Sequence, residues 1–292
     1  MNRRHALLVV VLSLVLLPGP TWAAEPLKVG VTLHPYYSWT KNVAGKSPVE
    51  VRPVVPGNID IDNFQPSPDD IQRLADLDAI VVNGVGHDDV VLDMIKASGN
   101  AKITLIRPND ATPQLRAPRG ERVNAHTFIS ITNAIRQTYE IQKALAALRP
   151  DLADTLQKNA SAYARRLRAL KTKYDVELVN AKRTRVVTVH EGYSYLLQEF
   201  GIDLAGVVEP AHGLLPSPVE LKEMADLLRR EKIRVVFSEE RFPDQMLRPL
   251  REASAARVYV LSHIATGDYT AEKFEKEMEE NLRTMIKALV KD

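Results

Sequence analysis

The sequence contains no cysteine among its 292 residues. This absence excludes disulfides, thiolate metal ligands, cysteine nucleophiles and a lipid attached through cysteine. The fold must therefore depend on a buried apolar core, and any metal site must use nitrogen and oxygen ligands.

A large charge of one sign is also missing, since 39 lysines and arginines stand against 37 acids. Residues 1–23 hold two of the basic residues and no acid, so the rest of the chain carries 37 of each and is formally neutral. Because basic clusters are absent too, we do not expect nucleic acid as a partner.

Long apolar runs are scarce, and the longest lies at the start of the chain. Residues 6–17 form an apolar run interrupted only by Ser13, too short to cross a bilayer, which takes about 20 residues. Arg3 and Arg4 precede this run, and the small residues Thr21 and Ala23 follow it. This pattern predicts a signal peptide over residues 1–23, and hence an exported, soluble protein of the periplasm.

One α/β unit occurs twice. The apolar, β-branched residues 27–33 and 184–189 both end at a histidine, and a glycine follows that histidine eleven residues later in both copies. Further along, "PSPDDIQRLAD" at residues 66–76 is echoed by "PSPVELKEMAD" at residues 216–226, each with the serine, proline and acid of a capped helix start.

This duplication predicts an α/β protein with two lobes, each a parallel sheet flanked by helices. Residues 150–182 have apolar residues at helical spacing, and we expect them to form one long helix that joins the lobes. The predicted domains are the N-terminal lobe at residues 24–149, this linking helix, and the C-terminal lobe at residues 183–292.

Histidines and acids gather where ligands bind in such folds, beyond the carboxyl ends of the strands. His34 and His190 follow the first strand of each lobe, and His126 precedes a predicted helix. Loops before the two capped helices add Asp62, Glu209 and His212. Imidazoles and carboxylates without cysteine suit a divalent first-row metal ion. His87 we interpret as structural, at the start of an exposed helix.

Catalytic patterns are weaker. Ser194 stands where the H-E-x-x-H signature needs its second histidine, and no nucleophile elbow or phosphate-binding loop occurs. A metallohydrolase would need Glu191 or Glu240 as its base. We therefore do not expect an enzyme.

Several motifs together resemble the cluster A metal-binding proteins of ABC importers. "HEGYSYLLQEFGI" at residues 190–202 resembles the family pattern "HDAYGYF…FGL", and residues 54–84 are similar to "PxGxDPHxYEPSPxDhxxLxxADLhhxNG". "NAHTFISI" at residues 124–131 resembles "HPHxWLDP". The resemblance runs through nearly the whole chain after residue 23. It implies two lobes joined by a rigid helix, with metal bound between them.

The family's ligands carry over only in part. Its second and third histidines fall on His126 and His190, whereas its first histidine falls on Asp62 and its last carboxylate on Ser262. His34 or His263 is a candidate to replace one of the two missing family ligands. The predicted metal ligands are therefore His126, His190, Asp62 and His34.

A site with more oxygen ligands than a zinc site favours Fe²⁺, then Mn²⁺ or Zn²⁺. The chain in this respect resembles the iron-handling member of the family that is associated with pyoverdine siderophore uptake. The resemblance implies a monomer that delivers its ion to an inner-membrane ABC permease. The alternative ligand is a metal chelate or siderophore, with Tyr36, Tyr37, Tyr193 and Tyr195 lining its pocket.

Overall fold

The structure is a computed structural model that describes residues 25–59, 61, 64–118, 120, 122–210 and 214–291. The predicted signal peptide lies outside these residues, as do Asp62 and His212. Among the described residues, the structure has no helix with both the length and the apolar character needed to cross a membrane.

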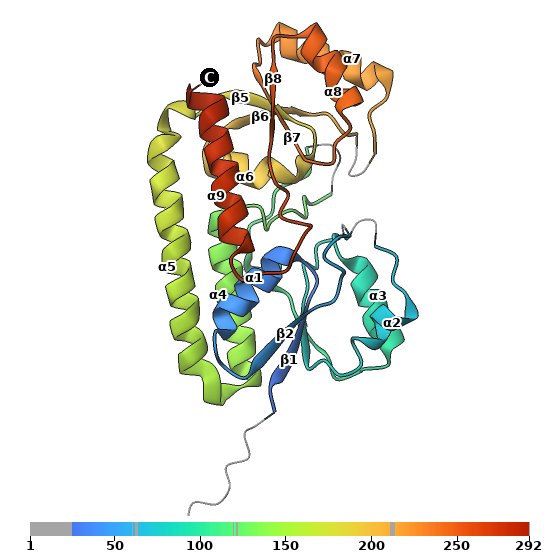
Figure 1. The fold of residues 1–292 in the computed structure, drawn as a ribbon, viewed down its shortest axis with the longest axis vertical. Coiled ribbons are helices and arrows are strands. Elements are labelled where there is room, and N and C mark those ends of the chain that lie inside the picture. The colour runs from blue at the N-terminus through green and yellow to red at the C-terminus, as the bar shows by residue number, and fades with distance from the viewer. Residues whose placement is uncertain are drawn as a thin grey trace, which may run out of the picture.

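Strands and helices alternate through two similar halves (Figure 1). In the first half the elements are β1 (Leu27–Val31), α1 (His34–Ala44), β2 (Val49–Pro53), α2 (Pro68–Gln72), β3 (Ala79–Val81), α3 (Asp89–Ser98), β4 (Thr104–Ile106) and the 3-10 turn η2 (Pro108–Ala111). Two long helices follow, α4 (Ile131–Leu148) and α5 (Ala153–Glu177), with the short turns η3 (Pro150–Leu152) and η4 (Val179–Ala181). The second half has β5 (Arg185–Thr188), η5 (Glu191–Tyr193), α6 (Ser194–Glu199), β6 (Asp203–Val207), α7 (Pro218–Arg230), β7 (Val235–Ser238), α8 (Asp244–Ala253), β8 (Arg257–Val260), α9 (Lys273–Ile286) and the π-helical turn η6 (Lys287–Lys291).

Each half forms one four-stranded parallel sheet. The strand orders are β2-β1-β3-β4 and β6-β5-β7-β8, so the second sheet repeats the topology of the first. Central strands are buried on both faces, as expected for parallel sheets that helices cover on both sides. The predicted fold class, with two lobes built on one repeated unit, is confirmed.

The two Ser-Pro helix starts form the capping boxes that their sequences predict. Ser67 accepts from the backbone N–H of Asp70, whose side chain accepts from the backbone N–H of Ser67 at 2.9 Å. Ser217 and Glu220 make the same pair of bonds, the second at 2.8 Å. The helices differ in length, because α2 has five residues and α7 has thirteen.

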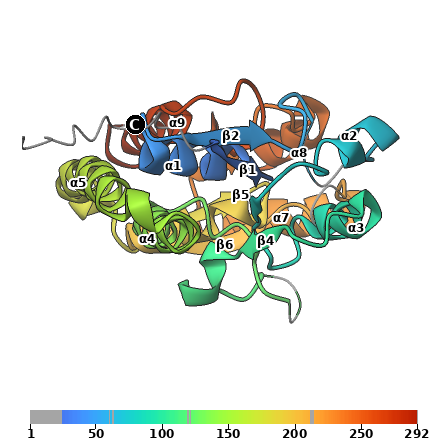
Figure 2. The ribbon, with the colours of Figure 1, turned by 90° about the horizontal axis from the view of Figure 1, so that it is seen from below.

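One long helix runs along both lobes, and two further helices pack beside it. The linking helix is α5, whose 25 residues extend for about 38 Å. In Figure 1 it spans both lobes, with α4 and α9 beside it, and in Figure 2 α4 and α5 lie on one side of the first sheet, opposite α2 and α3. The C-terminal helix α9 follows the second sheet in the chain but packs against α1 and α5. There the ring of Phe274 lies 5.2 Å from that of Trp39.

One apolar core joins the two lobes. It contains buried residues from both sheets and from α4, α5 and α9, whereas a smaller core lies between the second sheet and α7 and α8. Adjacent residues of β7 show the division, since Phe237 belongs to the shared core and Val236 to the smaller one. Successive strand residues point to opposite faces of the sheet, which explains this alternation.

Candidate metal centre

Three histidines from distant parts of the chain meet between the lobes. His190 follows β5, His263 follows β8, and His126 precedes α4. His126 and His190 are almost fully buried, and His263 is partly buried. One ring nitrogen from each lies within 4.8 Å of those of the other two. The convergence follows from the parallel sheet, because strand carboxyl ends share one edge.

The ring of His126 is held by the side chain of Asn124. Asn124 Oδ1 accepts from the backbone N–H of His126 at 3.0 Å and lies 2.9 Å from its ring Nδ1. Since an amide oxygen can only accept, Nδ1 carries the proton and the lone pair of the neutral ring is on Nε2. This tautomer suits metal binding through Nε2.

Glu209 holds His190 in the same way. Its Oε2 lies 3.0 Å from Nδ1 of His190, and both side chains are buried. The neutral His190 ring therefore also has its lone pair on Nε2, which lies 3.1 Å from Nε2 of His126. Two lone pairs at this distance repel each other unless a proton or a cation lies between them. The pair thus favours a bound cation.

Gly192 allows the backbone of η5 to pass directly beside the histidines. A Cβ atom at this position would lie 2.8 Å from Cδ2 of His190 and 2.8 Å from Nε2 of His263. Such distances are shorter than real Cβ contacts, so any larger residue would displace an imidazole. The sequence repeat gave no indication of this requirement.

Ser262 and His263 face different parts of the molecule. The Ser262 hydroxyl donates to Glu277 at 2.5 Å, and its backbone N–H donates to Asn281 at 2.7 Å, both on α9. Ser262, which stands where the family has a carboxylate, thus secures the loop to α9. His263 is the member of this pair that reaches the histidine cluster.

His87 lies beside the cluster rather than on an exposed helix. It is 5% exposed, and its ring centre lies 5.0 Å from that of His126. The prediction of an exposed position was wrong, because the adjacent Asp88 is buried and accepts from the backbone N–H groups of Asn83 and Gly84. These bonds turn the chain inward just before α3.

Two of the tyrosines proposed for a chelate pocket pack inside the protein near the cluster. Tyr193 is fully buried and donates to the carbonyl of Leu261 at 2.8 Å, and Tyr195 donates to that of Asn124 at 2.8 Å. Burial raises the pKa of Tyr193 well above its usual value, and the charges of Glu239, Glu209 and Glu240 raise it further. These carboxylates give the region a negative potential that favours cations.

Tyr36 is likewise fully buried, and its hydroxyl accepts from Asn83 and Asn109, each at 3.3 Å. Tyr37 is only partly buried, and its ring packs against Tyr269. Glu191, the base considered for a hydrolase, is buried and forms an ion pair with Arg122 at 2.5 Å. None of these three side chains belongs to the histidine cluster.

His34, the fourth predicted ligand, lies outside the cluster. Its Nε2 is 2.8 Å from the carbonyl oxygen of Gly267, and its ring stacks on Tyr269 with centres 3.8 Å apart and planes 2° apart. Burial lowers the pKa of His34 to about 4, so the ring is neutral at pH 7 and Nε2–H donates to Gly267.

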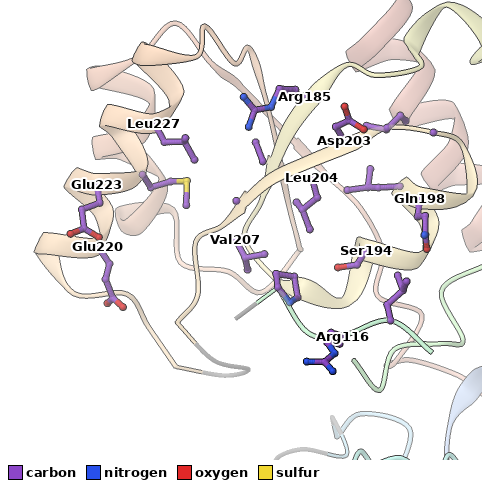
Figure 3. A pocket seen from close by; sticks show the side chains of 18 residues that line it. Arg116, Arg185, Ser194, Gln198, Asp203, Leu204, Val207, Glu220, Glu223 and Leu227 are labelled. Atoms are coloured by element: carbon purple, nitrogen blue, oxygen red, sulfur yellow. The ribbon is translucent and has the colours of Figure 1, made fainter. Parts of the chain in front are cut away.

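A separate cavity of about 950 Å³ lies along the outer edge of β6 (Figure 3). Its walls come from α6, α7 and the loop at Arg116, and the labelled Arg185 and Asp203 lie at one end of β6 while Arg116 and Val207 lie at the other. None of the three clustered histidines lines it. The cavity therefore adds no space at the histidine cluster.

Comparisons with known proteins agree with the family resemblance. The family described as zinc-uptake complex component A, periplasmic (ZnuA) matches residues 29–288. The solved structure of the solute-binding protein FpvC from Pseudomonas aeruginosa with Mn²⁺ is 42% identical, with a TM-score of 0.86, and the match covers 91% of this chain and 99% of FpvC. FpvC has also been solved with Ni²⁺.

Two further relatives are named for iron and zinc. The iron-binding protein YfeA of Yersinia pestis is 28% identical over 248 residues, which cover 82% of this chain and 78% of YfeA. The zinc-binding lipoprotein AdcA of Streptococcus pneumoniae is 24% identical over 293 residues, which cover 94% of this chain but 58% of AdcA. The chain thus spans little more than half of AdcA.

The family match extends through both lobes and the helix between them. It includes all three clustered histidines, and the FpvC match confirms the architecture at an identity well above chance. The chain therefore belongs to the ZnuA family, the cluster A metal-binding solute-binding proteins of ABC importers, which are transport proteins and not enzymes.

Proposed function

We propose that this protein binds a divalent metal ion in the periplasm and delivers it to an inner-membrane ABC permease. His126, His190 and His263 would supply three imidazole nitrogens from the second lobe and the start of α4. Asp62, on the loop before α2, remains the predicted oxygen ligand from the first lobe. The ion would thus lie between the two lobes.

The observation that carries this proposal is the orientation of the histidine pair. Asn124 and Glu209 occupy the Nδ1 atoms of His126 and His190, and the two Nε2 atoms face each other at 3.1 Å. Hydrogen-bonded partners that fix the tautomer and direction of ligating histidines are a general feature of metal sites. Without a shared proton, a purely structural buried pair would gain nothing from two opposed lone pairs.

The identity of the ion depends on the whole ligand set. Three neutral imidazoles and one carboxylate leave coordination positions for water or further oxygen atoms, which suits the six ligands of Fe²⁺ and Mn²⁺. We therefore keep Fe²⁺ as the preferred ion, followed by Mn²⁺ or Zn²⁺. With His263 as the third imidazole, the site has three histidines and one carboxylate, the same numbers as in the family motifs, so Zn²⁺ is the strongest competitor.

Anaerobic calorimetry with Fe²⁺, Mn²⁺, Zn²⁺ and Ni²⁺ tests the proposal. We expect His126→Ala, His190→Ala and His263→Ala each to weaken binding by about tenfold or more. Thr138→Val is the matched control, because it removes a buried hydrogen bond within α4, from the Thr138 hydroxyl to the Ala134 carbonyl, away from the cluster. Binding that is unchanged in all three histidine variants would refute the site.

The alternative ligand, a metal chelate, finds less support in the structure. Tyr36, Tyr193 and Tyr195 are buried, so they do not offer an open pocket surface for an organic ligand. The same calorimetry decides between the two, with a ferric siderophore as the second titrant. Tight binding of the siderophore together with no binding of bare ions would favour the alternative.

A further inference from the structure

The chain crosses from the second lobe to the first directly after His263. We call residues 264–272 the strap, because they lead from the histidine cluster to α9 along the surface of α1. Four contacts fix the strap to α1. His34 donates to the Gly267 carbonyl, and its ring stacks on that of Tyr269. The Ser38 hydroxyl donates to the Thr270 carbonyl at 2.8 Å. The Asn42 side-chain amide donates to the Ala271 carbonyl at 2.8 Å.

We infer that His34 is a positioning residue for metal binding: it fixes the strap on the first lobe, and the strap holds His263 against His126 and His190. This inference rests on the proposed function, because it explains how one of the proposed ligands is held in place. It also gives a role to a buried histidine that the ligand cluster does not include.

The chain between His263 and the residue that His34 contacts, Gly267, is too short to allow much independent movement. Gly267 is four positions after His263, a span of at most about 14 Å when fully extended. Part of that length is taken up at Ile264, a buried β-branched residue with φ of 58°, whose backbone N–H donates to the Ser262 hydroxyl at 3.0 Å. A β-branched residue adopts this conformation only where its surroundings impose it. Release of Gly267 would therefore remove the anchor of His263 on the first lobe and leave only the bonds of Ser262 to α9.

The same part of the strap also contacts the first lobe at Val55 and Gly57. The backbone N–H of Gly267 donates to the carbonyl of Gly57 at 2.7 Å. A Cβ atom on Gly57 would lie 2.4 Å from the Gly267 carbonyl oxygen, so only glycine permits this approach. Tyr269 adds a bond from its hydroxyl to the Val55 carbonyl at 3.0 Å. The strap is thus joined to the first lobe at Val55 and Gly57 as well as at His34.

A double-mutant cycle tests the inference, with Ni²⁺ affinity measured by calorimetry. We expect His34→Ala to weaken binding by about tenfold, the lower end of what outer residues of metal sites contribute. Because His34 acts through His263, His34→Ala should add nothing in a protein that already carries His263→Ala. X-ray absorption of Ni²⁺-loaded His34→Ala should show one imidazole fewer than the wild type. His34→Gln, which keeps a donor for Gly267, should restore part of the affinity.

Asn159→Ala is the matched control. Asn159 donates to the Val43 carbonyl at 3.0 Å and so anchors the other end of α1 without touching the strap. It should lower stability but leave Ni²⁺ affinity and the imidazole count unchanged. Full additivity in the cycle, or an unchanged imidazole count in His34→Ala, would overturn the inference. If His126→Ala, His190→Ala and His263→Ala all bind Ni²⁺ as the wild type does, the proposed function itself fails, whereas a loss in these variants without one in His34→Ala refutes only the role of His34.

Discussion

The stability of the metal-free protein should depend on the protonation of His34. Burial is the main cause that lowers the pKa of this ring from 6.5 to about 4, and the positive charge of Lys273 lowers it further. The hydrogen bond to the Gly267 carbonyl and the negative charge of Glu277 raise the pKa of His34, but by less than burial lowers it. The side chain is 2% exposed, so solvent screens these effects little. Acidification in the presence of a chelator, which keeps the protein free of metal, should therefore lower its stability.

The sign and size of the effect follow from proton linkage. Well above pH 6.5 neither the folded nor the unfolded chain binds a proton at His34, and the full stability is present. Between pH 6.5 and about 4 the unfolded chain binds the proton more tightly, so stability falls as the pH falls. Each tenfold difference in proton affinity is worth about 1.4 kcal/mol, and the fall from 6.5 to about 4 therefore corresponds to about 3 kcal/mol.

Urea denaturation of the wild type and of His34→Gln at several pH values measures this contribution. The glutamine variant has no titrating ring at this position, whereas all other ionisable groups are the same in both proteins. We expect the difference in free energy of unfolding between the two to shrink by about 3 kcal/mol from pH 7 to pH 4. A difference that stays constant over this range would refute the reasoning.

Three further predictions concern the cluster and the helix caps. Gly192→Ala should weaken Ni²⁺ binding by about tenfold or more with the fold intact, because the new Cβ displaces an imidazole; calorimetry and circular dichroism check both parts. Glu209→Gln should weaken Ni²⁺ binding by about tenfold, since the uncharged amide makes His190 a weaker ligand, and an unchanged affinity would speak against that role. Ser217→Ala should cost about 1 kcal/mol in urea denaturation through the lost N-cap bond while metal affinity stays the same.

Local sequence signals predicted much of this architecture. The capping boxes at Ser67 and Ser217 depend on residues only three positions apart, so they can be identified without the fold. The strand that ends before His190 is visible as an apolar, β-branched run, and the parallel topology then directs such strand ends to one edge. This is why His190 could be selected, whereas His126, which precedes a helix, is paired with it through the resemblance to the family motifs.

The contrast between His34 and His190 could not be predicted from the repeat. Both follow the first strand of a lobe, but α1 begins at His34 itself, whereas η5 intervenes between His190 and α6. His34 therefore turns toward the strap while His190 turns toward the cluster. The place of His263 depends on the same non-local crossing, because contacts between the strap and α1 join residues more than 200 positions apart. No local pattern carries that information.

The packing of α9 on α1 sets the order in which the protein can fold. Trp39 and Phe274 belong to one shared core, yet they are 235 positions apart in the chain, as their numbers show. A contact of such long range closes slowly, because the chain entropy must be lost before the apolar contact forms. When the chain is delivered from its N-terminus, the first lobe thus keeps apolar surface uncovered until the last helix arrives. The kinetic consequence is that the shared apolar core of both lobes is completed in one late folding step.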